Sequence, residues 1–290
     1  MSARPKGPAE GRGAGGGGRR RRDPGRRSGA TDGSFDGCAE VFDRLVELIG
    51  GPLDAYLEGV LHDRGERAVD LGCGSGRHAV LLAGRYRQVL GVDLSQPMLD
   101  IALQRRASGG IRFVRRDLRD LHPDRDGRFD LVLSTHTLHH VEDLDATLER
   151  IRELVAPGGR AVLVDNVAAR PAVPRRWFVA EAVRGLALDL ARRRRPPGEA
   201  LELFRLGTHP AWLDHVTSDR FLSPAEFARR YGRVFPGARY TDLYRARALC
   251  WDRPSSRWEL RSPLEAPPSS AWPSRHPQGG GGRQAPPLAG

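Results

Sequence analysis

The stretch Arg67-Ala-Val-Asp-Leu-Gly-Cys-Gly-Ser-Gly76 decides the fold of this 290-residue chain. A short apolar run ends at an acidic residue, three alternating glycines follow, and helix-forming sequence begins at Arg77. Glycine adopts positive φ and has no Cβ, so Gly72, Gly74 and Gly76 allow a sharp turn close to a ligand, at the positively polarised start of a helix. The stretch therefore predicts a strand, a tight turn and a helix that bind a nucleotide-like ligand.

Three further apolar runs also end in polar residues. They are residues 89–93, which end at Asp93, residues 111–115, which lead into Asp117, and residues 129–134, which lead into Thr135. Strands that alternate with helical segments predict a parallel sheet, whose ligands bind at the carboxyl ends of the strands. A carboxylate at the tip of a strand, such as Asp93, can accept both hydroxyls of a ribose. The glycine spacing G-x-G-x-G differs from the G-x-G-x-x-G of dinucleotide-binding proteins, which makes a nicotinamide dehydrogenase the disfavoured alternative.

Taken in order, five motifs resemble those of class I S-adenosylmethionine-dependent methyltransferases: Val69–Gly76, Gly91–Asp93, Arg116-Asp117-Leu118, Phe129–Ser134 and Pro157-Gly-Gly-Arg160. Leu138-His-His-Val141 and residues 154–159 most resemble the small-molecule group that includes the ubiquinone and menaquinone biosynthesis methyltransferases. The likeness covers about residues 68–167. It implies an α/β fold: a Rossmann-like, seven-stranded, mostly parallel sheet with helices on both faces, an antiparallel C-terminal hairpin, and a helical cap insertion after strand 5.

The resemblance also implies S-adenosyl-L-methionine as the cofactor. The residues that it assigns to cofactor binding are Asp70, Gly72, Cys73, Gly74, Gly76, Asp93, Leu94, Met98, Asp117, Leu118 and Ser134. In this assignment the glycines face the methionine and ribose, Asp93 holds the ribose hydroxyls, and Asp117 accepts from the adenine amino group. The Ser134 backbone lies beside the methionyl amine. Asp70 orders the glycine turn or meets that amine through water, with a helix-capping role as the alternative.

The histidines after the fourth predicted strand are the candidates for catalysis. Methyl transfer from a sulfonium is an in-line displacement that requires alignment and exclusion of water, and no catalytic side chain is strictly needed. An oxygen acceptor benefits from a general base, for which a neutral imidazole is suited. His140 and His136 rank ahead of His139 for this role, and the alternative is that these histidines only begin the next helix.

The segment 170–221 is expected to form the cap that recognises the substrate. Its aromatic residues Trp177, Phe178, Phe204, Trp212 and Phe221 either line an apolar pocket or form the small core of the cap itself, with His209, His215, Asp214 and Asp219 as polar groups. His215 with Asp214 and Asp219 has no second histidine or cysteine at ligand spacing, so no metal site is predicted. After the cap, Ser223-Pro-Ala-Glu226 is a helix-capping box, and residues 238–244 and 246–251 predict a hairpin.

Composition divides the chain into an expected folded body over 35–252, which the resemblance identifies as a methyltransferase domain, and two expected disordered tails, 1–34 and 253–290. Glycine, arginine, proline and serine dominate both tails, which cannot bury enough apolar surface to fold. The net charge is +11, yet residues 1–34 alone hold nine basic and three acidic residues. The basic character therefore lies mostly in the tails, and nucleic acid is a disfavoured partner. Neither the Asn/Asp-Pro-Pro-Tyr signature of base-modifying enzymes nor a Pro-Cys nucleophile occurs.

The remaining features are consistent with a cytoplasmic protein. Three scattered cysteines give neither a disulfide framework nor a C-x-x-C site, and the sequence has no transmembrane segment or signal-peptide pattern. The function predicted is methyl transfer to a small-molecule acceptor in cofactor or secondary metabolism. Two alternatives stay open, an RNA methyltransferase that uses the basic tails and a non-catalytic regulatory protein that binds S-adenosylmethionine. The acceptor atom and the oligomeric state are not determined by the sequence.

Overall fold

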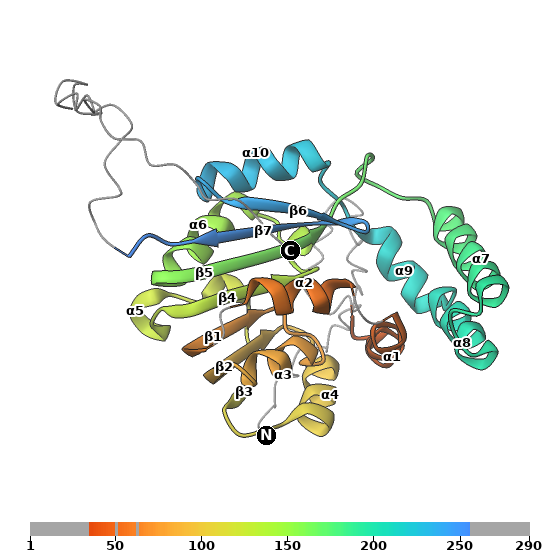
Figure 1. Ribbon diagram of the computed structural model, residues 1–290, viewed down its shortest axis with the longest axis horizontal. Coiled ribbons are helices and arrows are strands. Elements are labelled where there is room, and N and C mark those ends of the chain that lie inside the picture. Colours follow the sequence, from red (N-terminus) through yellow and green to blue (C-terminus); the bar gives the residue numbers. More distant parts are fainter. Residues whose placement is uncertain (1–34, 50–51, 62–63, 256–290) are drawn as a thin grey trace, which may run out of the picture. The chain divides into compact units, whose positions relative to one another are not determined.

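The computed structural model describes residues 35–49, 52–61 and 64–255. Within these ranges seven strands form one sheet in the order β3-β2-β1-β4-β5-β7-β6 (Figure 1). Strands β1 to β5 run parallel to their neighbours, whereas β7 is antiparallel to both β5 and β6. The strands are β1 (Gly65–Leu71), β2 (Tyr86–Asp93), β3 (Ile111–Arg115), β4 (Phe129–Thr135), β5 (Val155–Asn166), β6 (Arg239–Leu243) and β7 (Ala246–Asp252). The predicted Rossmann-like sheet with its C-terminal hairpin is confirmed.

Helices cover both faces of this sheet, as predicted. Those of the described residues are α1 (Ala39–Ile49), α2 (Pro52–Val60), α3 (Arg77–Ala83), α4 (Gln96–Arg106), α5 (Pro123–Asp126), α6 (Leu144–Leu154), α7 (Arg175–Arg192), α8 (Pro197–Gly207), α9 (Pro210–Ser218) and α10 (Pro224–Val234). Two short 3-10 helices, Leu118–Asp120 and Leu138–His140, follow β3 and β4. The predicted capping box begins α10, where Ser223 Oγ accepts from Glu226 N at 3.2 Å and the Glu226 carboxylate accepts from Ser223 N at 3.1 Å.

The apolar residues of the central strands alternate between two cores. Val69 and Leu71 of β1 belong to the core under α6 and α10, whereas Ala68 belongs to the core under α2 and α3 (Figure 1). In β4, Val132 lies in the first core and Leu131 in the second. Successive side chains of a strand point to opposite faces, so a strand that is buried on both faces reads as a continuous apolar run. This pattern fixes the register of the sheet and brings the polar strand ends to one edge.

The insertion after β5 forms the predicted helical cap, made of α7, α8 and α9. Phe178, Leu213 and Val216 give the cap a small core of its own. The chain leaves the sheet and returns to it at an isolated parallel bridge between Val167 and Leu222. This bridge closes the base of the insertion, so the cap is anchored at the carboxyl end of β5.

The motif Pro157-Gly-Gly-Arg160 lies inside the first part of β5. The strand starts at Val155 and shifts its register against β4 between Phe129 and Leu131. Gly158 N donates to Arg253 O at 2.9 Å, and Arg253 N donates to Gly159 O at 2.8 Å. The glycines therefore form an irregular but paired start of the strand, because the segment after β7 supplies hydrogen-bonding partners that local sequence does not reveal.

The predicted tail 1–34 and most of the predicted tail 253–290 lie outside the described residues. The domain boundaries at 35 and 252 stay predictions. In the described ranges no helix is both long and apolar enough to cross a membrane.

Candidate functional site

The glycine turn between β1 and α3 is formed by backbone hydrogen bonds. Gly72, Gly74 and Gly76 have φ values of +72°, +51° and +82°, in the left-handed region that favours glycine. Gly72 N and Cys73 N both donate to Val92 O, at 2.8 and 3.0 Å. The turn is thereby attached to the end of β2, next to Asp93.

The three glycines are required for different reasons. A Cβ at Gly72 would overlap the Thr137 side chain, and a Cβ at Gly76 would lie 2.6 Å from Phe113 Cζ. A Cβ at Gly74 would meet only Met98 Cε, at 3.7 Å. Gly72 and Gly76 therefore permit close packing inside the protein, whereas the space above Gly74 is open and borders the cavity.

Asp93, at the end of β2, lies beside this open space. Its Oδ2 accepts from Gly74 N at 2.8 Å and its Oδ1 accepts from Ser95 N at 2.9 Å. Burial raises the pKa of the Asp93 carboxyl, and the hydrogen bonds from Ser95 and Gly74 oppose that shift. Each carboxylate oxygen has lone pairs for more than one donor, so Asp93 can bind the turn and the hydroxyls of a ligand together.

Asp117, at the end of β3, already has an intramolecular partner. Its Oδ1 accepts from Arg119 N at 2.8 Å, and its Oδ2 lies 2.6 Å from Arg119 Nη2. Although burial acts to raise the pKa of Asp117, the hydrogen bonds from Arg119 lower it overall. An adenine amino group would share this carboxylate with an arginine, which sequence reasoning did not anticipate.

A single cavity of about 630 Å³ joins most of the predicted site residues. Those that line it are Gly72, Cys73, Gly74, Asp93, Leu94, Met98, Asp117, Leu118, His136 and His140. Asp70, Gly76 and Ser134 do not line it. Ser134 is fully buried and its Oγ donates to Leu71 O at 3.1 Å.

Asp70 differs most from its expected role. Its carboxyl is buried, and neither oxygen has a hydrogen-bond partner among the described residues. Burial raises the pKa of Asp70 to about 6, against the nearby His78. The described residues therefore contain no hydrogen bond through which Asp70 orders the glycine turn, and its contact with a cofactor stays a prediction.

The histidines after β4 lie in the 3-10 helix Leu138–His140 and just before it, not in a continuous helix. His139 is buried between two carboxylates: its Nδ1 is 2.5 Å from Asp165 Oδ1 and its Nε2 is 3.7 Å from Asp219 Oδ2. Burial acts to lower the pKa of His139, but Asp165 and Asp219 outweigh it and raise the pKa to about 10. His139 is therefore an imidazolium at neutral pH.

His136 and His140, the two predicted base candidates, are in the opposite protonation state to His139. Burial lowers the pKa of His136 to about 4, and burial together with the charge on His139 lowers the pKa of His140 to about 3. Both imidazoles are neutral at pH 7 and both line the cavity. They are available as hydrogen-bond acceptors, but such low pKa values make them weak proton acceptors.

The far end of the cavity lies against the cap. Phe178, Phe204, Trp212 and Phe221 line it, and Phe178 also belongs to the core of the cap. Phe178, and Trp212 packed against it, therefore belong both to the cavity wall and to the core of the cap, whereas Phe204 and Phe221 line the cavity only. Trp177 is different: it is 39% exposed, does not line the cavity, and stacks under the guanidinium of Arg245 at 4.3 Å.

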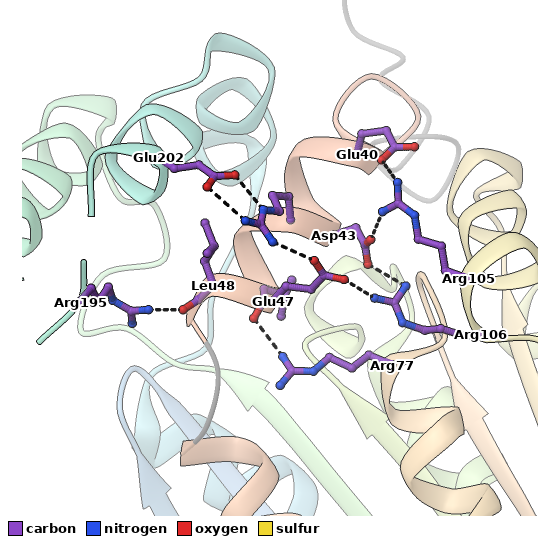
Figure 2. Close-up of polar contacts among 11 residues, drawn as sticks. Glu40, Asp43, Glu47, Leu48, Arg77, Arg105, Arg106, Arg195 and Glu202 are labelled. Atoms are coloured by element: carbon purple, nitrogen blue, oxygen red, sulfur yellow. Dashed lines mark hydrogen bonds and ion pairs between the residues drawn. The ribbon is translucent and has the colours of Figure 1, made fainter. Parts of the chain in front are cut away.

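α1 forms one side wall of the cavity through Phe42 and Leu45. Figure 2 shows that ion pairs hold this helix from two sides. The buried carboxylate of Asp43 lies 2.6 Å from Arg105 Nη1 and 2.9 Å from Arg106 Nη1, both on α4. On the opposite side, α1 is paired with Glu202 of α8 through Arg44, at 2.7 Å.

These contacts connect α1 to α4 on one side and to α8 of the cap on the other. The part of the cavity at the glycine turn and Asp93 is called its nucleotide end. Arg195, which follows α7, adds a hydrogen bond to Leu48 O (Figure 2). Arg195, the last residue of the run Arg192–Arg195, thus helps to hold α1 in place. The burial of Asp43 cannot be read from the residues around it, because its partners Arg105 and Arg106 are distant in the chain.

Comparisons with known proteins agree with this geometry. Residues 69–163 match the family model described as a methyltransferase domain. An uncharacterized methyltransferase of Mycobacterium tuberculosis is 37% identical over 114 residues, which cover 39% of this chain and 57% of the relative. This chain therefore spans little more than half of that relative. A demethylmenaquinone methyltransferase of Clavibacter sepedonicus is 29% identical over 216 residues, covering 72% of this chain and 86% of the relative.

Solved structures share the architecture. The chain is similar, with a TM-score of 0.50, to a chain of the complex between the Haloferax volcanii Trm112 methyltransferase activator and a methyltransferase. The two are 18% identical, and the alignment covers 77% of this chain and 97% of the other. At this identity the likeness concerns the fold alone.

Proposed function

We propose that this chain, which belongs to the class I S-adenosylmethionine-dependent methyltransferases, transfers the methyl group of that cofactor to a small, largely apolar acceptor bound beneath the cap. The observation that carries the proposal is the continuity of the cavity. It begins at the glycine turn and Asp93 and extends to the aromatic residues of α7 and α9 without a separating wall. One cavity can therefore hold a cofactor and an acceptor in contact.

The residues of the nucleotide end fit the cofactor. The open space above Gly74 lets a ligand approach the backbone closely, and Asp93 has acceptor capacity left for ribose hydroxyls. Leu94, Met98 and Leu118 supply apolar surface nearby. S-adenosylmethionine, when bound, supplies an electrophilic methyl group on a sulfonium. The contribution of these residues is to fix its orientation.

The cap end supports an aromatic or otherwise apolar acceptor. Phe204, Trp212 and Phe221 favour flat or apolar molecules, since aromatic rings provide large contact areas and defined stacking geometries. The relative from Clavibacter sepedonicus, which aligns over most of its length, is named for a quinone-type acceptor. A reduced quinone or another phenol is thus the first acceptor class to test. His136 and His140 remain the candidates to accept a hydrogen bond from its hydroxyl.

Calorimetric titration with S-adenosylmethionine, S-adenosylhomocysteine and NAD tests the cofactor half of the proposal. We expect binding of the first two and none of NAD; binding of NAD alone would refute the assignment. The acceptor half is tested with methyl-labelled cofactor and three acceptors: a demethylated naphthoquinol, a simple catechol and total RNA. Label transfer to RNA but to neither small molecule would favour the RNA methyltransferase alternative.

A further inference from the structure

Two histidines and a carboxylate from separate parts of the chain meet in the wall of the cavity. His139 and His140 follow β4, whereas Asp219 follows α9 at the base of the cap. One potential ligand atom from each residue lies within 4.8 Å of the other two. Asp219 Oδ2 is 3.7 Å from His139 Nε2, and Asp219 Oδ1 is 3.6 Å from His140 Nδ1. These distances are longer than hydrogen bonds.

Asp165 fixes the orientation of the His139 ring. Its Nδ1 lies 2.5 Å from Asp165 Oδ1, and the hydroxyl of Tyr231 lies 3.4 Å from the other oxygen of Asp165. The Nε2 of His139 therefore faces Asp219. A carboxylate that holds one nitrogen of a histidine, so that the other is aimed at a common point, is the usual support of a histidine that binds a metal.

One atom of the cluster lacks a hydrogen-bond partner. Asp219 is only 6% exposed, yet its Oδ1 has no hydrogen-bond partner among the described residues. Buried polar atoms without a partner are uncommon and point to a group that binds there. The composition agrees, because the carboxylates of Asp165 and Asp219 lie beside the two imidazoles and provide negative charge that attracts a cation.

We propose that His139, His140 and Asp219 bind a divalent transition-metal ion, with Asp165 as the residue that orients His139. Two imidazoles and one carboxylate are a donor set typical of Zn²⁺ and Fe²⁺. In a tetrahedral zinc site neighbouring donor atoms lie about 3.4 Å apart, close to the 3.7 and 3.6 Å that separate Asp219 from His139 and His140. The ion displaces the proton on Nε2 of His139.

All three ligands also line the cavity, so positions of the ion that the protein does not fill face the acceptor end. There a metal would bind an acceptor oxygen and lower the pKa of the acceptor hydroxyl, so that loss of its proton would not depend on a histidine base. This role rests on the proposed function. The binding of the ion does not.

Cobalt titration of the untagged 290-residue chain, stripped of metal with a chelator, tests the site. We expect one Co²⁺ per chain with visible d–d absorption that one equivalent of Zn²⁺ displaces. Asp219→Asn and His140→Gln should each weaken Co²⁺ binding at least 100-fold, and Asp165→Asn by about 10- to 100-fold. His122→Ala, a change of a partly exposed histidine that does not belong to the cluster, should bind Co²⁺ like the wild type.

Either of two results would overturn the proposal. If the native chain shows no saturable Co²⁺ absorption, or if Asp219→Asn binds Co²⁺ as tightly as the wild type, the cluster is not a metal site. Titration of the same samples with S-adenosylhomocysteine shows whether each variant is folded. It also keeps a failure of the metal site distinct from a failure of the proposed methyltransferase function.

Discussion

Replacement of Gly74 by alanine, compared with replacement of Gly72 by alanine, distinguishes a glycine that faces the ligand from a glycine that allows close packing. Both positions have left-handed φ, where alanine costs about 1–2 kcal/mol relative to glycine. At Gly74 the added Cβ meets only Met98 Cε, at 3.7 Å, so no further cost is expected. At Gly72 the Cβ overlaps Thr137, and overpacking adds about 1–3 kcal/mol.

These free energies translate into distinct melting temperatures. For a domain of this size 1 kcal/mol shifts Tm by roughly 2–4 °C, so Gly74→Ala should lower Tm by about 2–8 °C and Gly72→Ala by about 4–20 °C. The methyl group at position 74 also projects into the cavity. If a cofactor packs against this backbone, its affinity falls by about 1–3 kcal/mol, or roughly 5- to 150-fold.

Thermal unfolding measures the change in Tm of each variant, and calorimetric titration measures its affinity for S-adenosylhomocysteine. The expected signature of Gly74→Ala is a small loss of stability with a large loss of affinity. Wild-type affinity in this variant would refute the placement of the cofactor above Gly74. A loss of stability as large as that of Gly72→Ala would refute the packing argument.

Three other predictions depend on single carboxylates or histidines. Asp93→Asn should weaken S-adenosylhomocysteine binding roughly 10- to 150-fold in calorimetry, because a hydrogen bond to a charged group contributes about 1.5–3 kcal/mol; an unchanged affinity would exclude Asp93 as the ribose ligand. The pKa of His139 is raised to about 10 in the folded, metal-free protein, so the stability from its protonation is complete below about pH 6.5 and is lost as pH rises through 10. In denaturant titrations the free energy of unfolding should therefore fall between pH 7 and 10 in the wild type but not in His139→Gln. The same dependence on pH in both proteins would contradict the prediction. Asp43→Asn removes the charge shared by Arg105 and Arg106, and should lower the free energy of unfolding by about 1–3 kcal/mol in urea titration, whereas an unchanged midpoint would show that α1 is held by apolar contacts alone.

Much of the nucleotide end of the site is readable from the sequence. Gly72, Gly74 and Asp93 line one cavity, because the tips of neighbouring parallel strands lie at one edge of the sheet; their binding of the cofactor stays a prediction. Asp117 reaches the same edge, but its pairing with Arg119 is a side-chain choice that the motif does not specify. Asp70 has the expected place in the chain, yet its buried carboxyl does not line the cavity.

The sequence by itself determined the alternation of strands and helices, the glycine turn, the capping box at Ser223 and the order of motifs that indicates the family. These features depend on residues that are close together in the chain, where apolar periodicity and backbone preference act directly. Only the tertiary structure brought Asp219 to His139 and buried Asp43 between two arginines. Such contacts join segments far apart in the chain, and their partners are set by how the cap and α1 pack against the sheet, which no local pattern encodes.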